Sequence, residues 1–306
     1  MYLIKKGSMT VYYVVIGIAT VAAIFIPTFR TPLNALNILR QSITLGIVST
    51  GQTLVILSGG FDLSVGSAMS LTACLTSGIM QSRWEAMIPV LFFVLLVGAT
   101  IGAANGLIIS KLKVTPFIAT FAMMSMIQGM AYMYTKKPVG GIPRELSLFA
   151  DGYIGPIPFP VVFFTGVIII GSIILKRRTF GRYLYAVGGN QEYARLSGIN
   201  PHLIIIITYV MSGLLAAVAG VFLTARMGIG DPLAGQGFEL DSITAVLLGG
   251  ARLLGGEGNL INTYGGVLII SIMSNVLNLL NISGFWQMII KGIILVSVVT
   301  IRFKVK

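Results

Sequence analysis

The chain has 306 residues, of which 56% are hydrophobic and only 10% are charged, with a formal net charge of +12. An ordinary soluble domain carries about 25% charged residues, so this composition excludes a soluble globular protein and indicates helices packed in lipid. The basic residues stand at the ends of apolar segments rather than on one amphipathic face, which argues against a nucleic-acid surface and is typical of membrane orientation.

Apolar segments follow one another along the chain and predict an all-α membrane protein, a polytopic bundle of about ten transmembrane helices in a single domain, since a span needs roughly 20 apolar residues. The segments are 11–26, 42–57, 63–80, 86–110, 115–134, 159–175, 202–224, 239–250, 260–280 and 285–301. Lys5 and Lys6 precede the first, but Pro27 follows it in place of a cleavage site, so we expect an uncleaved span. Because several segments are short or broken by glycine, we expect some to be tilted, discontinuous or re-entrant.

Two glycine motifs lie at the breaks between neighbouring segments. GGFDLSVG (59–66) aligns without gaps to GGARLLGG (249–256), and both fit the pattern G-G-x-(charge)-L-x-x-G. Transporters are often built from internal repeats whose broken helices meet near the pathway, although chance is the alternative in a glycine-rich chain. The structural residues of these motifs are Gly59, Gly60, Asp62, Gly66, Gly249, Gly250, Arg252 and Gly256. An ion pair between Asp62 and Arg252 is a further hypothesis.

Amide side chains inside the predicted spans are the candidate pathway residues. Polar groups in lipid are costly, and they mark either functional sites or hydrogen bonds between helices. Amides donate and accept without a charge, which suits an uncharged polyhydroxylated substrate. The candidates are Gln52, Asn105, Gln128, Asn275 and Asn278. Lys291, in the last span, is expected to snorkel toward the inner face.

The distribution of Lys and Arg among the connections predicts the orientation. The connection 176–201 begins with Lys176-Arg177-Arg178, and the C-terminus ends in three further basic residues, whereas the connection 135–158 is rich in proline. We therefore expect 176–201 and both termini in the cytoplasm. The segment 135–158 is then outside, where its rigid turns either cover a pore mouth or meet an external partner.

The inside connection contains the pattern of a short amphipathic helix. Gly188-Gly189-Asn190 supplies a turn and an N-cap, Glu192 suits the first turn, and Gly198 ends the helix. Tyr193, Leu196 and Ile199 would then seat in the groove of a partner. A solvated linker is the alternative.

Motifs for nucleotide binding and catalysis are missing. The sequence has no G-x-x-x-x-G-K-[ST], G-x-G-x-x-G, G-x-S-x-G or H-E-x-x-H. Cys74 is the only cysteine and His202 the only histidine, so no Cys/His metal spacing exists. We expect no catalytic residue, no metal and no cofactor in this chain, and ATP-driven transport would need a second protein. The scarcity of acids in the spans argues against an ion-coupled carrier.

Six ordered motifs carry a family resemblance. They are GGFDLSVG (59–66), PFIAT (116–120), GRYLYAVGGN (181–190), ARLSGI (194–199), GFELD (237–241) and VLLGG (246–250). From about residue 37 to 301 the chain resembles the permease subunits of monosaccharide ABC importers, and most of all those for ribose. Three residues depart from the family pattern. Phe61 stands where the family commonly has Ile, Arg252 where it has Thr or Ser, and Glu257 where it has Lys or Arg.

The resemblance implies a multi-pass permease of the bacterial cytoplasmic (inner) membrane. Its implied partners are a second permease subunit (identical or a close paralogue), a separate subunit that binds ATP and Mg, and an extracytoplasmic sugar-binding protein. It also implies that 189–200 docks on the ATPase, with Gly189, Asn190, Glu192, Tyr193, Ala194, Arg195, Leu196, Gly198 and Ile199 as coupling residues.

The expected substrate is ribose or a related pentose. The same permease architecture also suits galactofuranose, allose or a quorum-signal sugar. The alternatives are an importer of nucleosides or branched-chain amino acids, a secondary carrier that works alone, and a passive membrane scaffold.

Overall fold

The computed structural model describes residues 10–304, so Lys5 and Lys6 lie outside it. The α-helices are α1 (Thr10–Phe25), α2 (Pro32–Leu57), α3 (Val65–Met80), α4 (Met87–Lys111), α5 (Pro116–Tyr134), α6 (Arg144–Asp151), α7 (Phe159–Arg177), α8 (Thr179–Gly189), α9 (Gln191–Leu196), α10 (Pro201–Met227), α11 (Phe238–Leu248), α12 (Leu260–Leu279) and α13 (Gly284–Lys304). The 3-10 turns η1 (Pro27–Arg30) and η2 (Trp84–Ala86) precede α2 and α4. Strands β1 (Tyr153–Ile154) and β2 (Ile157–Pro158) form an antiparallel hairpin.

Within the described residues, four helices are long and apolar enough to cross a membrane: η2 with α4 (Trp84–Lys111), α7, α10 and α12. Helices α1 and α3 and the stretch Gly284–Thr300 of α13 are shorter and apolar. The predicted all-α polytopic membrane fold is confirmed. A helix lies over each predicted segment, and the largest difference is at α2, which begins at Pro32 rather than at residue 42. Thr31 caps this helix through a hydrogen bond from the Asn34 amide at 3.2 Å, and proline suits its first position.

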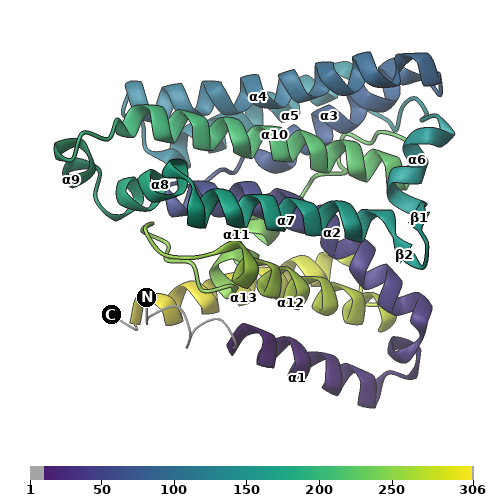
Figure 1. The fold of residues 1–306 in the computed structure, drawn as a ribbon. Coiled ribbons are helices and arrows are strands. Elements are labelled where there is room, and N and C mark those ends of the chain that lie inside the picture. Colours follow the sequence, from purple (N-terminus) through teal and green to yellow (C-terminus); the bar gives the residue numbers. More distant parts are fainter. Residues whose placement is uncertain (1–9, 305–306) are drawn as a thin grey trace.

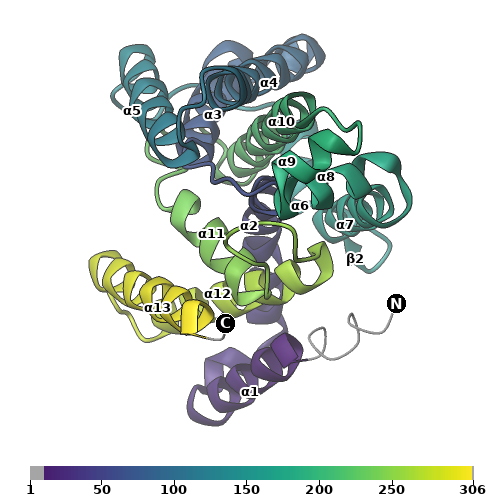
Figure 2. The ribbon, with the colours of Figure 1, turned by 90° about the vertical axis from the view of Figure 1, so that its left-hand side faces the viewer.

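The long helices run side by side, with α8 and α9 at one end of the bundle and α6 and the β-hairpin at the other (Figure 1). The start of α1 and the end of α13 lie toward the end that carries α8 and α9. Figure 2 looks along the bundle from that end: α5 and α13 stand far apart, and α11 lies between them.

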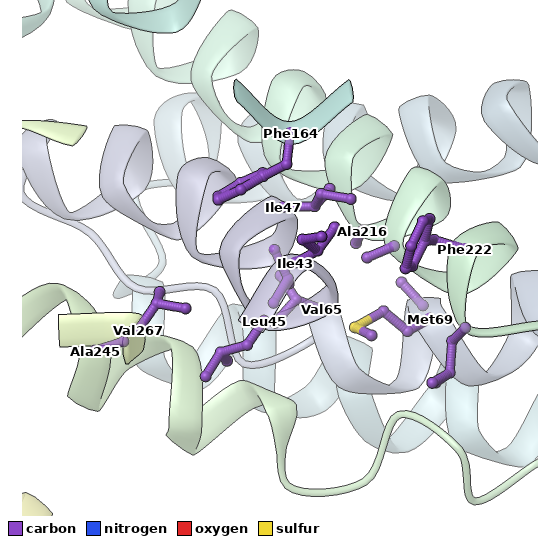
Figure 3. Packing of buried hydrophobic residues seen from close by; sticks show 14 of the residues in the cluster. Ile43, Leu45, Ile47, Val65, Met69, Phe164, Ala216, Phe222, Ala245 and Val267 are labelled. Atoms are coloured by element: carbon purple, nitrogen blue, oxygen red, sulfur yellow. The ribbon is translucent and has the colours of Figure 1, made fainter. Parts of the chain in front are cut away.

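Helix α2 is the centre of the packing. Every residue from Ser42 to Leu57 is buried. Figure 3 shows the largest cluster around it, in which side chains of α2, α3, α7, α10, α11 and α12 meet: Ile43, Leu45, Ile47, Met69, Phe164, Ala216, Phe222, Ala245 and Val267. Three buried hydroxyls of α2, those of Ser42, Thr50 and Thr53, bond carbonyls of their own helix, as Thr53 Oγ1 does to the Ser49 carbonyl at 2.6 Å. A half-polar helix can therefore occupy the middle of the bundle.

Three glycines of α4, spaced four residues apart, bring this helix against α10. A Cβ on Gly102 would lie 2.7 Å from the Tyr209 carbonyl carbon, and one on Gly106 would lie 2.8 Å from the Ile206 Cα. Gly98 meets Gly213 of α10 in the same way. Small residues at this spacing let two helix backbones touch in lipid, where packing and not hydrophobic burial holds helices together.

Both Gly-rich breaks interrupt the helices, as the sequence predicts. Residues 58–64 separate α2 from α3, and residues 249–259 separate α11 from α12. Helix α11 has 11 residues, so at 1.5 Å per residue it is about 16 Å long and reaches only halfway through a bilayer core. Such a discontinuous helix is stable at membrane depth because protein surrounds its ends.

The two long connections are more structured than a loop. The segment 135–158 holds α6 and the hairpin, and it is fixed to α3: the Ser82 amide bonds the Gly141 carbonyl at 3.1 Å, and Ser77 Oγ bonds the Val139 carbonyl at 2.8 Å. The segment 176–201 folds into α8 and α9. Helix α8 was not expected, because Gly188-Gly189 reads as a free turn in the sequence; in the structure the pair forms the last positions of this helix.

Candidate functional site

The two glycine motifs meet each other and the end of α8. The Gly256 amide donates to the Leu57 carbonyl, at the end of α2, at 3.0 Å. A Cβ on Gly188 would lie 2.8 Å from the Gly256 nitrogen and closer still to the Leu57 carbonyl oxygen. A Cβ on Gly255 would lie 2.8 Å from the Gly59 nitrogen. We call this contact of residues 57–59, 188 and 255–256 the glycine junction, and at positions 188 and 255 only a residue without a side chain fits it.

Asp62 holds the first break together from inside. Its side chain is buried, with a relative exposure of 1% for the residue. Oδ1 accepts from the Ser64 hydroxyl at 2.6 Å and the Ser64 amide at 3.0 Å, and Oδ2 accepts from the Ser212 hydroxyl of α10 at 2.8 Å. The carboxylate therefore ties the break to α10, the helix that follows α9.

The hypothesis that Asp62 pairs with Arg252 is wrong. Arg252 forms its ion pair with Glu257 at 3.4 Å, within its own break, and both side chains are largely exposed. A buried carboxylate needs compensation, but charge is only one source of it, and here hydroxyl and amide donors supply it. The two residues that depart from the family pattern in this motif thus pair with each other.

Two of the amides proposed for the pathway belong to the same buried network. Asn105 of α4 donates to the Ser64 hydroxyl at 2.9 Å. Gln52 of α2, with its amide oriented to satisfy both groups, donates to the Asp62 carbonyl at 3.1 Å and accepts from the Asp62 amide at 3.3 Å. Tyr209 of α10 adds a hydrogen bond to the Phe61 carbonyl at 2.9 Å. These side chains order the break, and neither amide lines the polar cavities described below.

Helix α9 protrudes from one end of the bundle (Figure 1). Asn190 caps it as predicted: Oδ1 accepts from the Glu192 amide at 2.9 Å and the Tyr193 amide at 3.0 Å. Glu192 and Arg195 pair at 2.7 Å on its surface. Gly198 has φ of +80°, a conformation that favours glycine at the end of a helix. Local interactions alone thus define this short helix.

The side chains of α9 divide into an inner and an outer set. Ala194 is buried and Ile199, just after the helix, packs with it against Leu184 and Ile204 in one cluster. Ile199 is therefore half-buried against its own chain, unlike the other two apolar residues of the predicted set. Tyr193 and Leu196 point outward, with relative exposures of 71% and 74%. They are three residues apart and share one face, as a docking surface requires.

Helix α8 connects α9 to the second break. The Tyr185 hydroxyl donates to the Gly258 carbonyl at 2.7 Å. Burial raises the pKa of Tyr185, so the phenol stays protonated and keeps this hydrogen bond at neutral pH. Gly189, at the end of α8, has open space around it, in contrast to Gly188.

The remaining amides take different places. Asn275 of α12 and Asn34 of α2 exchange two buried hydrogen bonds, at 3.0 and 2.8 Å, so this amide joins helices and reaches neither polar cavity. Gln128 donates to the Pro232 carbonyl at 2.9 Å and lines a cavity of about 390 Å³ between α5 and α11. Asn278 accepts from Gln287 at 2.8 Å and lines a cavity of about 490 Å³ between α11, α12 and α13.

The larger cavity contains an ion pair that the sequence did not predict. Lys291 of α13 pairs with Asp241 of α11 at 2.6 Å, so it does not snorkel to the inner face. The pair was missed because the two helices are brought together only by the tertiary fold. Ser271, Ser274 and Asn278 of α12 share one face of the helix, and this spacing was a readable signal of a polar surface.

Comparison with known proteins identifies relatives along nearly the whole chain. It is 40% identical to the ribose import permease protein RbsC of Bacillus subtilis (strain 168) over 289 residues, which cover 93% of this chain and 89% of that protein. It is 40% identical to RbsC of Escherichia coli (strain K12), covering 99% and 95%, and 38% identical to the L-arabinose transport system permease protein AraH of the same organism, covering 97% and 90%. No solved structure matches the chain.

The match to a family covers most of the described helices. Residues 34–299 match the family described as "branched-chain amino acid transport system / permease component", a range that runs from the start of α2 almost to the end of α13. It includes both glycine breaks, α9 and the two polar cavities. The chain belongs to this family of membrane permease components.

Proposed function

We propose that this chain is the transmembrane permease subunit of an ATP-driven ABC importer that moves a monosaccharide, ribose or a close relative, into the cytoplasm. The observation that carries the proposal is α9, a capped helix with two outward apolar side chains that is joined through α8 to the junction of both broken helices. The substrate class rests on relatives named for ribose and arabinose transport at 38–40% identity over nearly their full length.

The proposal assigns α9 to the ATPase partner. Leu196 and Tyr193 would enter a groove of that subunit, while Glu192 and Arg195 hold the helix in shape through their ion pair. The residues facing inward, Ala194 and Ile199, fix α9 to the permease. With α9 at the cytoplasmic face, the start of α1 and the end of α13 are cytoplasmic as well, in agreement with the basic residues of 176–201.

The glycine junction explains how a movement of α9 reaches the transport pathway. Only Asn190 separates α9 from α8, and Gly188 of α8 touches the backbone of both breaks without space between them. A displacement of α9 therefore moves the ends of α2 and α11 together. ATP binding to the partner subunit favours one arrangement of the permease only if the partner's contacts to α9 differ between the two arrangements.

The complete importer would contain a second permease subunit, identical or a close paralogue, two ATPase subunits and a binding protein on the opposite face. That face carries α6 and the hairpin, which are fixed against α3 and offer an ordered surface to an external partner.

The test is uptake into liposomes. The chain alone, the chain with its ATPase, and the chain with ATPase and binding protein are reconstituted, and uptake of labelled D-ribose, L-arabinose, a nucleoside and L-leucine is measured. We expect uptake of a pentose that needs ATP and all three components. Uptake by the lone chain under an ion gradient would show a secondary carrier. ATP-driven uptake of leucine and of no sugar would show that the chain carries branched-chain amino acids, the substrates in the family's description.

A further inference from the structure

The cavity of about 490 Å³ described above lies among α2, α10, α11, α12 and α13. Its volume is that of a small-molecule site, since such sites measure roughly 300–1,000 Å³. Along α12 it extends from Ile270 to Asn278, about 12 Å at 1.5 Å per residue. Asn278 is at the end of α12 remote from the break, so the cavity occupies the half of the bundle away from α9.

One wall of the cavity is a row of neutral polar groups. Ser271, Ser274 and Asn278 recur at spacings of three and four on α12, and Gln41 and Gln236 face them from α2 and the loop before α11. Ser271 is buried, with a relative exposure of 4%, and within the described residues its hydroxyl makes no hydrogen bond. A buried serine in a helix usually bonds a carbonyl one turn earlier, as Thr53 does in α2. The free hydroxyl of Ser271 is therefore available to a ligand in the cavity.

A second part of the cavity wall carries the ion pair of Asp241 and Lys291, with N–O distance 2.6 Å. Because the two charges lie in contact, this wall has no net charge, yet it offers both a strong acceptor and a strong donor. A hydroxyl group donates and accepts, so it can bond both members of such a pair without separating them. Arg226 of α10 also lines the cavity, so the charged part of the lining consists of two donors and one acceptor, groups that bond the hydroxyls of a ring.

We propose that this cavity is a binding site for a polyhydroxylated ring, where the sugar contacts the permease on its way across. Ser271 and Ser274 bond some of the ring hydroxyls, and the Asp241–Lys291 pair bonds others. The apolar parts of the lining, among them Leu45, receive the C–H faces of the ring. This inference rests on the proposed function, because the sugar reaches the cavity only if the chain is a permease.

The first test is protection of a single cysteine. Cys74, the only native cysteine, is replaced by Ala, and Ser274→Cys is introduced to report on the cavity; Ser125→Cys, in the smaller cavity beside α5, is the matched control. The purified full chain in nanodiscs is alkylated with N-ethylmaleimide with and without D-ribose. We expect millimolar ribose to slow alkylation at residue 274 several-fold and to leave residue 125 unaffected. L-leucine, which is of similar size but has no ring hydroxyls, should protect neither.

Equal rates at residue 274 with and without ribose, up to the solubility limit of the sugar, would overturn the proposal. Protection by leucine but not ribose would overturn its ligand class.

The second test separates this inference from the proposed function. In the complete reconstituted importer, Ser271→Ala should reduce sugar uptake at low concentration by about 3- to 10-fold, the effect of one lost hydrogen bond. Ser297→Ala is the control, because the Ser297 hydroxyl bonds its own helix at the Ile293 carbonyl and lies outside the cavity. If the unmodified importer takes up pentose and Ser271→Ala does so equally well, the site is wrong and the function stands. If the unmodified importer takes up no monosaccharide, the function itself fails.

Discussion

Gly188→Ala is the most direct perturbation of the contact between α8 and the two breaks. The added Cβ would lie 2.8 Å from the Gly256 nitrogen and closer to the Leu57 carbonyl oxygen, and both are backbone atoms that cannot rotate away. Overpacking of this kind costs about 1–3 kcal/mol, and more where backbone must shift. The gain in helix propensity offsets about 0.5–1 kcal/mol of it. Gly189→Ala is the matched control, because it receives the same gain and meets nothing within 4 Å.

The two variants should therefore differ by the overpacking cost, about 1–3 kcal/mol in unfolding free energy. At about 2–4 °C per kcal/mol, thermal unfolding in detergent should place Gly188→Ala roughly 2–12 °C below Gly189→Ala. In the reconstituted importer, Gly188→Ala should retain ATP hydrolysis, because the outer face of α9 is unchanged, but move less sugar per ATP. Equal melting temperatures and equal uptake for the two variants would refute the argument that the junction transmits movement by close contact.

The remaining predictions address the cap, the ion pair and the buried carboxylate. Asn190→Ala removes the acceptor for two amides of α9 and should cost about 1 kcal/mol, seen as roughly fivefold faster hydrogen exchange in α9; unchanged exchange would contradict the cap. Lys291→Met leaves the mostly buried Asp241 carboxylate without its ion partner and should lower the unfolding free energy of the protein by about 3–5 kcal/mol. The double variant with Asp241→Asn should regain most of this loss, as measured by thermal unfolding. Additive losses would show that the pair does not couple. Asp62→Asn should destabilise far more than Arg252→Gln, whose surface ion pair contributes less than about 1 kcal/mol, and the reverse order would refute the network at the first break.

Features set by neighbouring residues were predictable from the sequence. The helix after Asn190 is one example, because its cap, its internal ion pair and its terminal Gly198 all lie within nine residues. The two breaks are another, since glycine pairs between apolar segments interrupt helices wherever they fall. The four-residue spacing of Gly98, Gly102 and Gly106 also indicates close helix packing, and only the partner helix could not be read from it.

Features that depend on which helices become neighbours were not predictable. Asp62 and Arg252 occupy matching positions in two motifs, yet the hydroxyl groups of Ser64 in the break and Ser212 on α10 reach the carboxylate first. Lys291 lies where a snorkelling lysine would, but α11 places Asp241 beside it. The Gly188-Gly189 pair reads as a turn because the contact that requires glycine there comes from Leu57 and Gly256, far away in the sequence.

The central claim is that α9 couples a separate ATPase to transport through this chain, and removal of its outer face tests it most directly. The double variant Tyr193→Ala and Leu196→Ala is compared with the unmodified chain in the reconstituted importer, and ATP-driven pentose uptake is measured beside thermal unfolding of the permease. Because both side chains are exposed and contribute little to the fold, we predict an unchanged melting temperature and a loss of uptake of at least about tenfold, with the ATPase no longer copurifying. Uptake equal to that of the unmodified chain would contradict the account.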